Sequence, residues 1–268
     1  ISRSQISKLA KGLDEEVRAW RSRPLTKPYP YLVVDACYEK IRVNHQVLSQ
    51  GVLLVVGIRA DGYREILGTW VADSESEASW SEVFKELKDR GLRGVQYVVS
   101  DDHAGMCKAI ERYFRGCLWQ RCQVHFMRNI ISQVSKKDRA KVIEMVREIM
   151  TAQSYESARK RMDEVIEALE ETHPKVSEML EEHGEEILAV YQLPLLHRRF
   201  MKSTNMLERY NQELKRRTRV VRIFPHQESC LRLVTAMAME TSEEWMVRRY
   251  LVFDMEVSGK DTKDLLAA

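Results

Sequence analysis

Two short apolar runs, each closed by an aspartate, constrain this chain more than any other feature. Residues 31–34 are followed by Asp35, and residues 95–100 are followed by Asp101. Runs of this length, bounded by polar residues and separated by a helical pattern, are typical of neighbouring parallel strands in a mixed sheet. Both aspartates would then emerge at the same edge of the sheet. The pattern predicts an α/β fold that holds two acidic side chains close together.

A third acid, Glu208, lies in a helical stretch that leads into a basic cluster. Carboxylates held a few ångströms apart raise each other's pKa unless positive charge lies against them. Mg²⁺ is commonly held by one or two carboxylates together with phosphate oxygens. Taken singly, each acid is more often a turn former or a helix cap. Taken together, Asp35, Asp101 and Glu208 can hold two divalent metal ions.

Four segments carry a resemblance to a known family: residues 29–36, 99–106, 121–129 and 204–211. In this order and at this spacing they resemble the signature blocks of the Mutator-like transposases of bacterial insertion sequences. The resemblance extends from Ile1 to about Val257. It implies an RNase H-like fold, a DDE active site that uses Mg²⁺, and the cutting and joining of DNA at transposon ends.

The resemblance assigns roles to the three acids. Asp35, Asp101 and Glu208 match the catalytic residues of the family, which bind two Mg²⁺ ions, and we expect Mn²⁺ to substitute. The second block departs from the family at Asp102, where glycine is frequent. We favour Asp101 as the metal ligand because it follows the strand directly.

Periodicity predicts five strands and two connecting helices for the first half of the chain. The strands cover residues 31–37, 50–60, 63–71, 95–100 and 117–120, with a hairpin turn at Asp61 and Gly62. Residues 79–90 and a stretch through Met106 read as helices. This order is that of an RNase H-like core, a mixed five-stranded sheet flanked by helices.

The interval from Asp101 to Glu208 is too long for one strand and one connection, so it contains an insertion. Apolar residues repeat at helical spacing from Val142 to Met150 and from Met162 to Leu169, which predicts an all-α insertion between the last strand and the Glu208 helix. We divide the chain into an N-terminal DNA-binding end with linker, a first core part, the helical insertion, the closing helices and a tail, at residues 1–29, 30–126, 127–200, 201–257 and 258–268.

The N-terminal segment fits a short helix pair that resembles the end of the family's helix-turn-helix region. Pro24, Pro28 and Pro30 mark the linker that follows. The net charge of +3 is uninformative, but residues 195–225 are strongly basic. A charge run is usually a solvated face. Because this one follows Glu208 directly, it favours a surface that tracks DNA phosphates.

The predicted DNA contacts combine this run with the block at residues 121–129. They are His125, Asn205, Arg209, Lys215, Arg216, Arg217, Arg219 and Arg222. We predict that Asn205, Gln212 and Lys215 share the Glu208 face of the helix, opposite an apolar stripe formed by Leu207, Tyr210, Leu214 and Thr218.

Three further side chains are expected to support the site. Cys122 and His125 form a C-x-x-H pair that, with Cys117, invites a zinc interpretation, but no second Cys/His pair follows. The resemblance instead makes it the family's C-x-x-H block near the active site. Trp119 either stacks on an unpaired base or belongs to the core. His103 either caps a helix, orients a carboxylate or touches DNA.

The favoured function is a DNA transposase that nicks transposon ends and joins strands through the 3′-OH. An RNase H-like nuclease or resolvase without joining, and a catalytically inactive DNA-binding regulator, are the alternatives. The helical insertion and basic helix disfavour a minimal nuclease, and the intact acids disfavour a regulator. We expect double-stranded DNA as partner, both terminal repeats and target, and a homodimer that holds two ends.

Composition predicts an intracellular protein. No run of about 18 apolar residues exists, so no membrane span is expected. Five cysteines, an odd number, suit a reducing compartment. Ile1 opens the chain without a charged and apolar leader, so we expect no signal peptide and a start inside a longer protein. The expected location is cytoplasmic and associated with the nucleoid.

Overall fold

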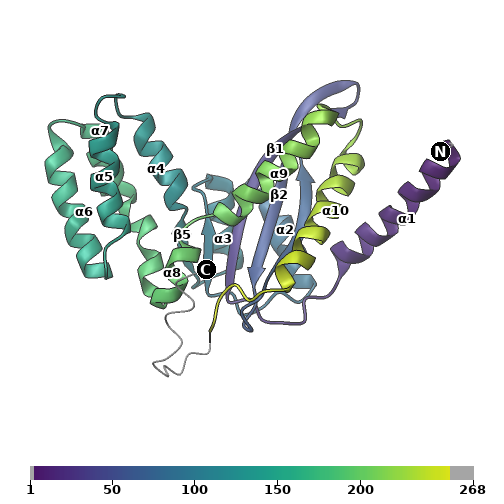
Figure 1. Ribbon diagram of the computed structural model, residues 1–268, viewed down its shortest axis with the longest axis horizontal. Helices are drawn as coiled ribbons and strands as arrows, with labels where there is room; N and C mark the ends of the chain where they lie inside the picture. The colour runs from purple at the N-terminus through teal and green to yellow at the C-terminus, as the bar shows by residue number, and fades with distance from the viewer. Residues whose placement is uncertain (1–2, 254–268) are drawn as a thin grey trace.

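A mixed five-stranded sheet forms the centre of the protein (Figure 1). The computed structural model describes residues 3–253. Along the sheet the strands follow the order β3-β2-β1-β4-β5. Antiparallel pairs join β1 to β2 and β2 to β3, whereas β1 to β4 and β4 to β5 are parallel. The predicted α/β sheet with flanking helices is confirmed. The strands are β1 (Tyr31–Val43), β2 (Gln46–Ile58), β3 (Arg64–Ala72), β4 (Tyr97–Ser100) and β5 (Leu118–Arg121).

The first strand is longer than its apolar run suggests. β1 was predicted to end at residue 37, but it pairs with β2 as far as Val43, opposite Gln46. Asn44 and His45 make the turn with positive φ angles of 48° and 65°, as a tight hairpin requires. Asp35 therefore lies well inside β1 and not near its end, where the predicted strand of residues 31–37 placed it. The outer part of β1 was missed because Glu39, Lys40 and Arg42 interrupt the apolar signal.

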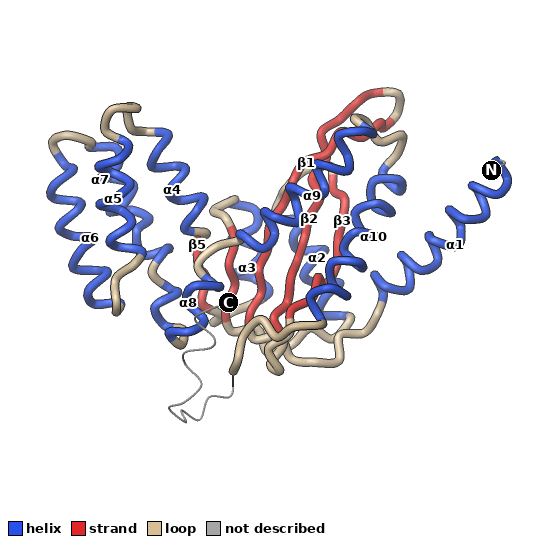
Figure 2. The backbone as a smooth tube through the Cα atoms, viewed as in Figure 1, coloured by secondary structure: helices blue, strands red, loops and turns tan. Residues whose placement is uncertain are grey.

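Two helical layers cover the sheet, one on each face (Figure 2). Helices α2 (Glu77–Asp89) and α3 (Ala104–Tyr113) pack on one face, and α9 (Asn205–Val221) and α10 (Gln227–Met246) lie over the other. Alternate residues of β1 point to opposite faces. Leu32 and Val34 join the core beneath α2 and α3, while Tyr31 and Val33 join the core on the α9 side. The same alternation directs Asp35 toward α9.

Along the chain, a group of helices follows β5 and precedes α9. In space, these helices lie beyond the β5 edge of the sheet (Figure 1). Val142, Val146 and Ile149 of the first predicted helical repeat are buried there, and so are Met162, Val165 and Leu169 of the second. The helical spacing of apolar residues in the sequence thus correctly predicted the buried face of each of these two helices. The helices are α4 (Gln123–Ser132), α5 (Arg139–Met150), α6 (Tyr155–Glu170), α7 (Pro174–His183) and α8 (Leu195–Met201), with 3₁₀ turns η1 (Gly184–Ile187) and η2 (Ala189–Gln192).

The N-terminal segment is one helix, not the predicted pair. α1 (Arg3–Ser22) runs through Gly12 without a break and projects from the body of the protein (Figure 1). Its described contact with α10 includes an ion pair between Asp14 and Arg232, with 2.9 Å between Oδ2 and Nη2. None of the helices within residues 3–253 is long and apolar enough to cross a membrane. The tail at 258–268 and the end of the closing segment lie outside the described residues.

Candidate active site

The register of β1 and β4 brings Asp35 level with Asp101. Val33 of β1 is paired with Val99 of β4, and the parallel ladder stops there. Continuing that register by two residues places Asp35 beside Asp101 at the point where the two strands separate. This pairing supports the prediction that both acids lie together at one edge of the sheet.

Asp35 is a buried carboxylate with few partners. It is 5% exposed. Burial raises its pKa to about 7; the nearby His125 works against that rise, whereas the charges of Asp101 and Glu208 add to it. The Asn211 amide of α9 donates a hydrogen bond from Nδ2 to Asp35 Oδ2 at 3.0 Å. The charges of Asp101 and Glu208 therefore both act on Asp35.

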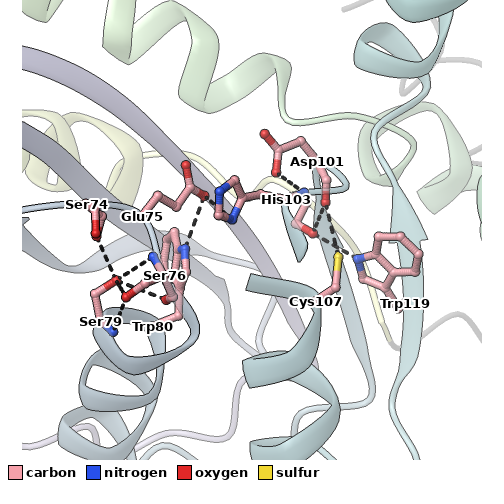
Figure 3. A network of polar contacts seen from close by, with 10 residues as sticks. Ser74, Glu75, Ser76, Ser79, Trp80, Asp101, His103, Cys107 and Trp119 are labelled. Carbon is pink, nitrogen blue, oxygen red and sulfur yellow. Dashed lines mark hydrogen bonds and ion pairs between the residues drawn. The ribbon is translucent and has the colours of Figure 1, made fainter. Parts of the chain in front are cut away.

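Asp101 and Asp102 face different partners although they are adjacent. The Asp101 carboxylate accepts a hydrogen bond from the backbone N–H of His103 at 3.2 Å (Figure 3). Asp102 instead forms an ion pair with Arg121, a side chain only 3% exposed that also bonds Glu186 at 2.9 Å. The electrostatic link to Asp35 comes from Asp101.

A fourth carboxylate, Glu75, lies near Asp101 and was missed in the sequence. Its side chain is 6% exposed, accepts a hydrogen bond from Trp80 Nε1 at 3.1 Å, and lies 3.8 Å from His103 Nδ1 (Figure 3). Burial and then the charge of Asp101 raise the pKa of Glu75. His103 is the N-cap residue of α3, but its side chain makes no capping bond. In sequence Glu75 belongs to a polar loop, which carries no signal of burial.

Glu208 projects from α9 toward two basic side chains of α4. Its Oε1 lies 2.9 Å from Arg128 Nη1 and 3.4 Å from His125 Nε2. The predicted apolar stripe of α9 is confirmed, because Leu207, Tyr210, Leu214 and Thr218 are all buried. Arg128 was not singled out in the sequence; its spacing of three residues from His125, on one helix face, was the available signal.

Cys122 links the starts of the two helices that carry His125 and Glu208. It is the N-cap residue of α4, and its Sγ accepts hydrogen bonds from Thr204, the N-cap residue of α9, at 3.4 Å from N and 3.5 Å from Oγ1. Burial opposes ionisation of the thiol, but interactions with His125 and Thr204 outweigh it and lower the Cys122 pKa. Interaction with Cys122 raises the pKa of His125 to about 9. Both directions favour a thiolate that faces an imidazolium.

No three His, Cys, Asp or Glu side chains within residues 3–253 are already placed to ligate one metal ion. The zinc interpretation of Cys117, Cys122 and His125 thus gains no support. The same holds for the three acids, of which Glu208 pairs with Arg128 instead.

Trp119 contributes to the core and to the surface. Its Nε1 donates to Ser100 Oγ at 2.9 Å, next to Asp101 in the chain. It packs against the core beneath α2 and α3, and it also lines an open hollow of about 860 Å³ beside α3, together with Phe114 and Arg115. The core interpretation of Trp119 is therefore correct for part of the ring.

The cations on the second half of α9 fall into two groups, those in ion pairs and those for which residues 3–253 give no ion pair. Arg216 and Arg217 bond Glu213 at 2.7 and 2.9 Å, and Arg217 also reaches Glu240 at 3.1 Å. The remaining predicted DNA contacts of α9 and its C-cap are at least partly exposed: Asn205, Arg209, Lys215, Arg219 and Arg222. The placement of Asn205, Gln212 and Lys215 on the Glu208 face stays a prediction. The residue of α9 that donates a hydrogen bond to Asp35 is Asn211, which was not singled out in the sequence.

The fold and site are those of a mixed α/β protein with a buried acidic centre beside a basic helix. Residues 1–248 match the Mutator family of transposases. The transposase for insertion sequence element ISRM5 of Rhizobium meliloti (strain 1021) is 43% identical over 255 residues, which cover 95% of this chain and 64% of that protein. The chain belongs to the Mutator family of transposases.

Two further relatives have similar coverage. The transposase for IS406 of Burkholderia multivorans (strain ATCC 17616 / 249) is 41% identical, and that for IS256 in transposon Tn4001 of Staphylococcus aureus is 38% identical. Each match covers 95% of this chain and 66% of the relative. The chain thus spans slightly less than two thirds of the length of these relatives.

Proposed function

We propose that this chain is the catalytic region of a DNA transposase that nicks DNA at transposon ends and transfers the strand through the resulting 3′-OH. The observation that carries the proposal is the β1/β4 register, which sets Asp35 level with Asp101, with Glu208 brought within electrostatic reach by α9. Membership of the Mutator family supports it, because the relatives are named as transposases of insertion sequences.

The fold is interpreted as RNase H-like. Its support is the strand order, in which an antiparallel β3-β2-β1 meander continues into the parallel strands β4 and β5. The helices from α4 to α8 are then an all-α insertion between the last strand and the Glu208 helix. The insertion contributes Arg128 to the acidic centre, so it takes part in the site as well as in the core.

The acidic centre fits hard divalent cations. A carboxylate as buried as Asp35, with two further acidic charges acting on it, is costly without positive charge beside it. Asp35, Asp101 and Glu208 are proposed to hold two Mg²⁺ ions, with Mn²⁺ as a substitute. Two such ions stabilise the attacking and leaving oxygens of a phosphoryl displacement. Glu208 has to leave Arg128 in order to join such a site.

The basic side chains around Glu208 are proposed to receive DNA phosphate. Arg128 and His125 approach Glu208 in the free protein, and when Glu208 turns to the cations, both are freed for the anionic substrate. Arg offers a bidentate fork that matches phosphate. The α9 cations continue this surface and contact the DNA backbone, while Asp102 stays bound to Arg121.

The partners follow from the reaction. The proposed substrates are double-stranded DNA at the terminal repeats and at the target, and a homodimer holds the two ends. The test is incubation of the whole chain with a labelled transposon-end duplex and Mg²⁺, with Asp35→Asn as the inactive control. Strand-transfer products support the transposase. Nicking without joining identifies a nuclease or resolvase, and binding without cleavage identifies a regulator.

A further inference from the structure

Asn211 is a buried amide at the acidic centre, and only one of its two ends has a hydrogen-bond partner within residues 3–253. It lies one helical turn after Glu208 on α9, so both side chains project from similar faces of the helix. The residue is only 9% exposed. Its Nδ2 donates to Asp35 Oδ2 at 3.0 Å, whereas its buried Oδ1 accepts no hydrogen bond from any residue of the described chain, 3–253.

When Asp35 is ionised, as a cation ligand has to be, its carboxylate only accepts hydrogen bonds. The NH₂ end of Asn211 then faces Asp35, and the carbonyl oxygen needs a different partner. A buried acceptor without a donor is unfavourable, and such groups in native proteins call for an explanation. The neighbouring Gln212 shows the contrast, because its side chain is exposed and can be solvated.

We propose that Asn211 is a fourth residue of the divalent-cation site: its NH₂ group positions Asp35, and its Oδ1 is a neutral oxygen ligand for a cation. Hard cations accept amide oxygens as well as carboxylates. Asn211 would then hold α9 against β1 through its hydrogen bond to Asp35. It would also add an oxygen ligand for the cation without adding a further negative charge. This inference rests on the proposed function, since it assumes that Asp35 holds a divalent cation.

The test is the affinity of the metal-free whole chain for Mn²⁺ without DNA, measured from the electron paramagnetic resonance signal of free Mn²⁺. Asn211→Leu keeps the number of side-chain heavy atoms and the branch at Cγ, and it removes donor and acceptor. We expect it to weaken Mn²⁺ binding by about tenfold or more, as the loss of groups that hold or orient ligands does. Asn211→Asp places a charged oxygen at the same point, and we expect Mn²⁺ to bind about threefold more tightly or better, because affinity rises with ligand charge. Gln212→Leu, the matched control, should leave the affinity unchanged.

Opposite shifts in the two variants distinguish a ligand from a residue that only packs. If both Asn211 variants bind Mn²⁺ like the wild type, the inference is overturned. Should Asn211→Leu fail to give the wild-type circular dichroism spectrum, the direction of the Asn211→Asp shift decides. Asp35→Asn separates this inference from the proposal beneath it. Loss of Mn²⁺ binding in Asp35→Asn with unchanged Asn211 variants rejects Asn211 alone, whereas wild-type Mn²⁺ binding by Asp35→Asn rejects the cation site itself.

Discussion

The two halves of α9 differ in what they touch although one continuous helix forms them. The first half carries Glu208 and Asn211 into the acidic centre, where they meet Arg128 and Asp35. The second half, from Lys215 onward, exposes cations, and two of these are bound to Glu213. A single basic stretch in the sequence therefore separates into a part that enters the acidic centre and a part that faces solvent. Substitutions in the two parts should differ in kind.

The largest effect is expected for the acids that the first half helps to assemble. Asp35→Asn, Asp101→Asn and Glu208→Gln should each abolish nicking and joining, because each removes a charged oxygen with little change of volume. Binding of the transposon-end duplex should persist. Gel assays of cleavage and of binding on the same preparations measure both. Asp102→Asn is the control, since its carboxylate pairs with Arg121; an inactive Asp102→Asn beside an active Asp101→Asn would reverse the assignment.

A large effect on stability is expected from the burial of Asp35. Its pKa of about 7 in the folded chain lies above the ordinary 3.8. Between these values the unfolded chain loses the proton while the folded chain retains it, so the wild type loses stability as the pH rises from about 4 to 7. Asp35→Asn does not titrate. Its stability relative to the wild type should therefore grow over this range, by up to about 4 kcal/mol.

Urea unfolding of the metal-free proteins at pH 4.5, 6 and 7.5 measures this difference. Repeating the series with excess Mg²⁺ should shrink it, because a cation favours the ionised Asp35 of the wild type alone. A difference between the two proteins that stays constant with pH would show that Asp35 ionises in the folded chain as freely as in water.

The sequence predicted the sheet well because its signals are local. Apolar runs and turn residues located all five strands. The helix predicted at residues 79–90 is α2, which buries Trp80, Val83, Phe84 and Leu87. The outer half of β1 was missed because Glu39, Lys40 and Arg42 break the apolar run on which the prediction of this strand relied. The prediction of two N-terminal helices was wrong because Gly12 lowers helix propensity without ending a helix.

The three acids of the candidate site could be picked out from the sequence, whereas the residues that surround them could not. Asp35 and Asp101 stood out because each closes an apolar run, and shared register then brings them together. Glu75, Arg128 and Asn211 reach the centre through tertiary packing of three separate elements. Apart from the spacing of Arg128 from His125 on one helix face, nothing in their local sequence distinguishes these residues from solvated polar residues. The folded arrangement was therefore needed to identify them.

A moderate effect is expected at the start of the first half, where Cys122 holds Thr204. Cys122→Ala removes the acceptor for two buried donors of Thr204, so we expect a loss of about 1–3 kcal/mol in unfolding free energy. It also removes the group that raises the pKa of His125. The His125 pKa, followed by NMR titration of its ring, should therefore fall toward the ordinary value of 6.5. Cys122→Ser should restore stability more than it restores the His125 pKa, and an unmoved pKa in both variants would contradict the pairing.

The smallest effect is expected in the second half of α9, and it should appear in salt dependence. Arg219 and Arg222 make no ion pair within residues 3–253, whereas Arg216 and Arg217 already bond Glu213. If the exposed cations contact the DNA backbone, Lys215→Ala, Arg219→Ala and Arg222→Ala combined should weaken binding to transposon-end and random duplexes alike. Removing one bound phosphate from the interface lowers the slope of log affinity against log salt by about 0.9. Sequence preference should persist, because phosphate contacts position the protein on the duplex and do not specify the sequence.

Arg216→Ala with Arg217→Ala should change the slope less per residue, since DNA must first displace Glu213. Affinities at several salt concentrations decide the matter: an unchanged slope in the triple variant would mean that the second half is only a solvated helix face.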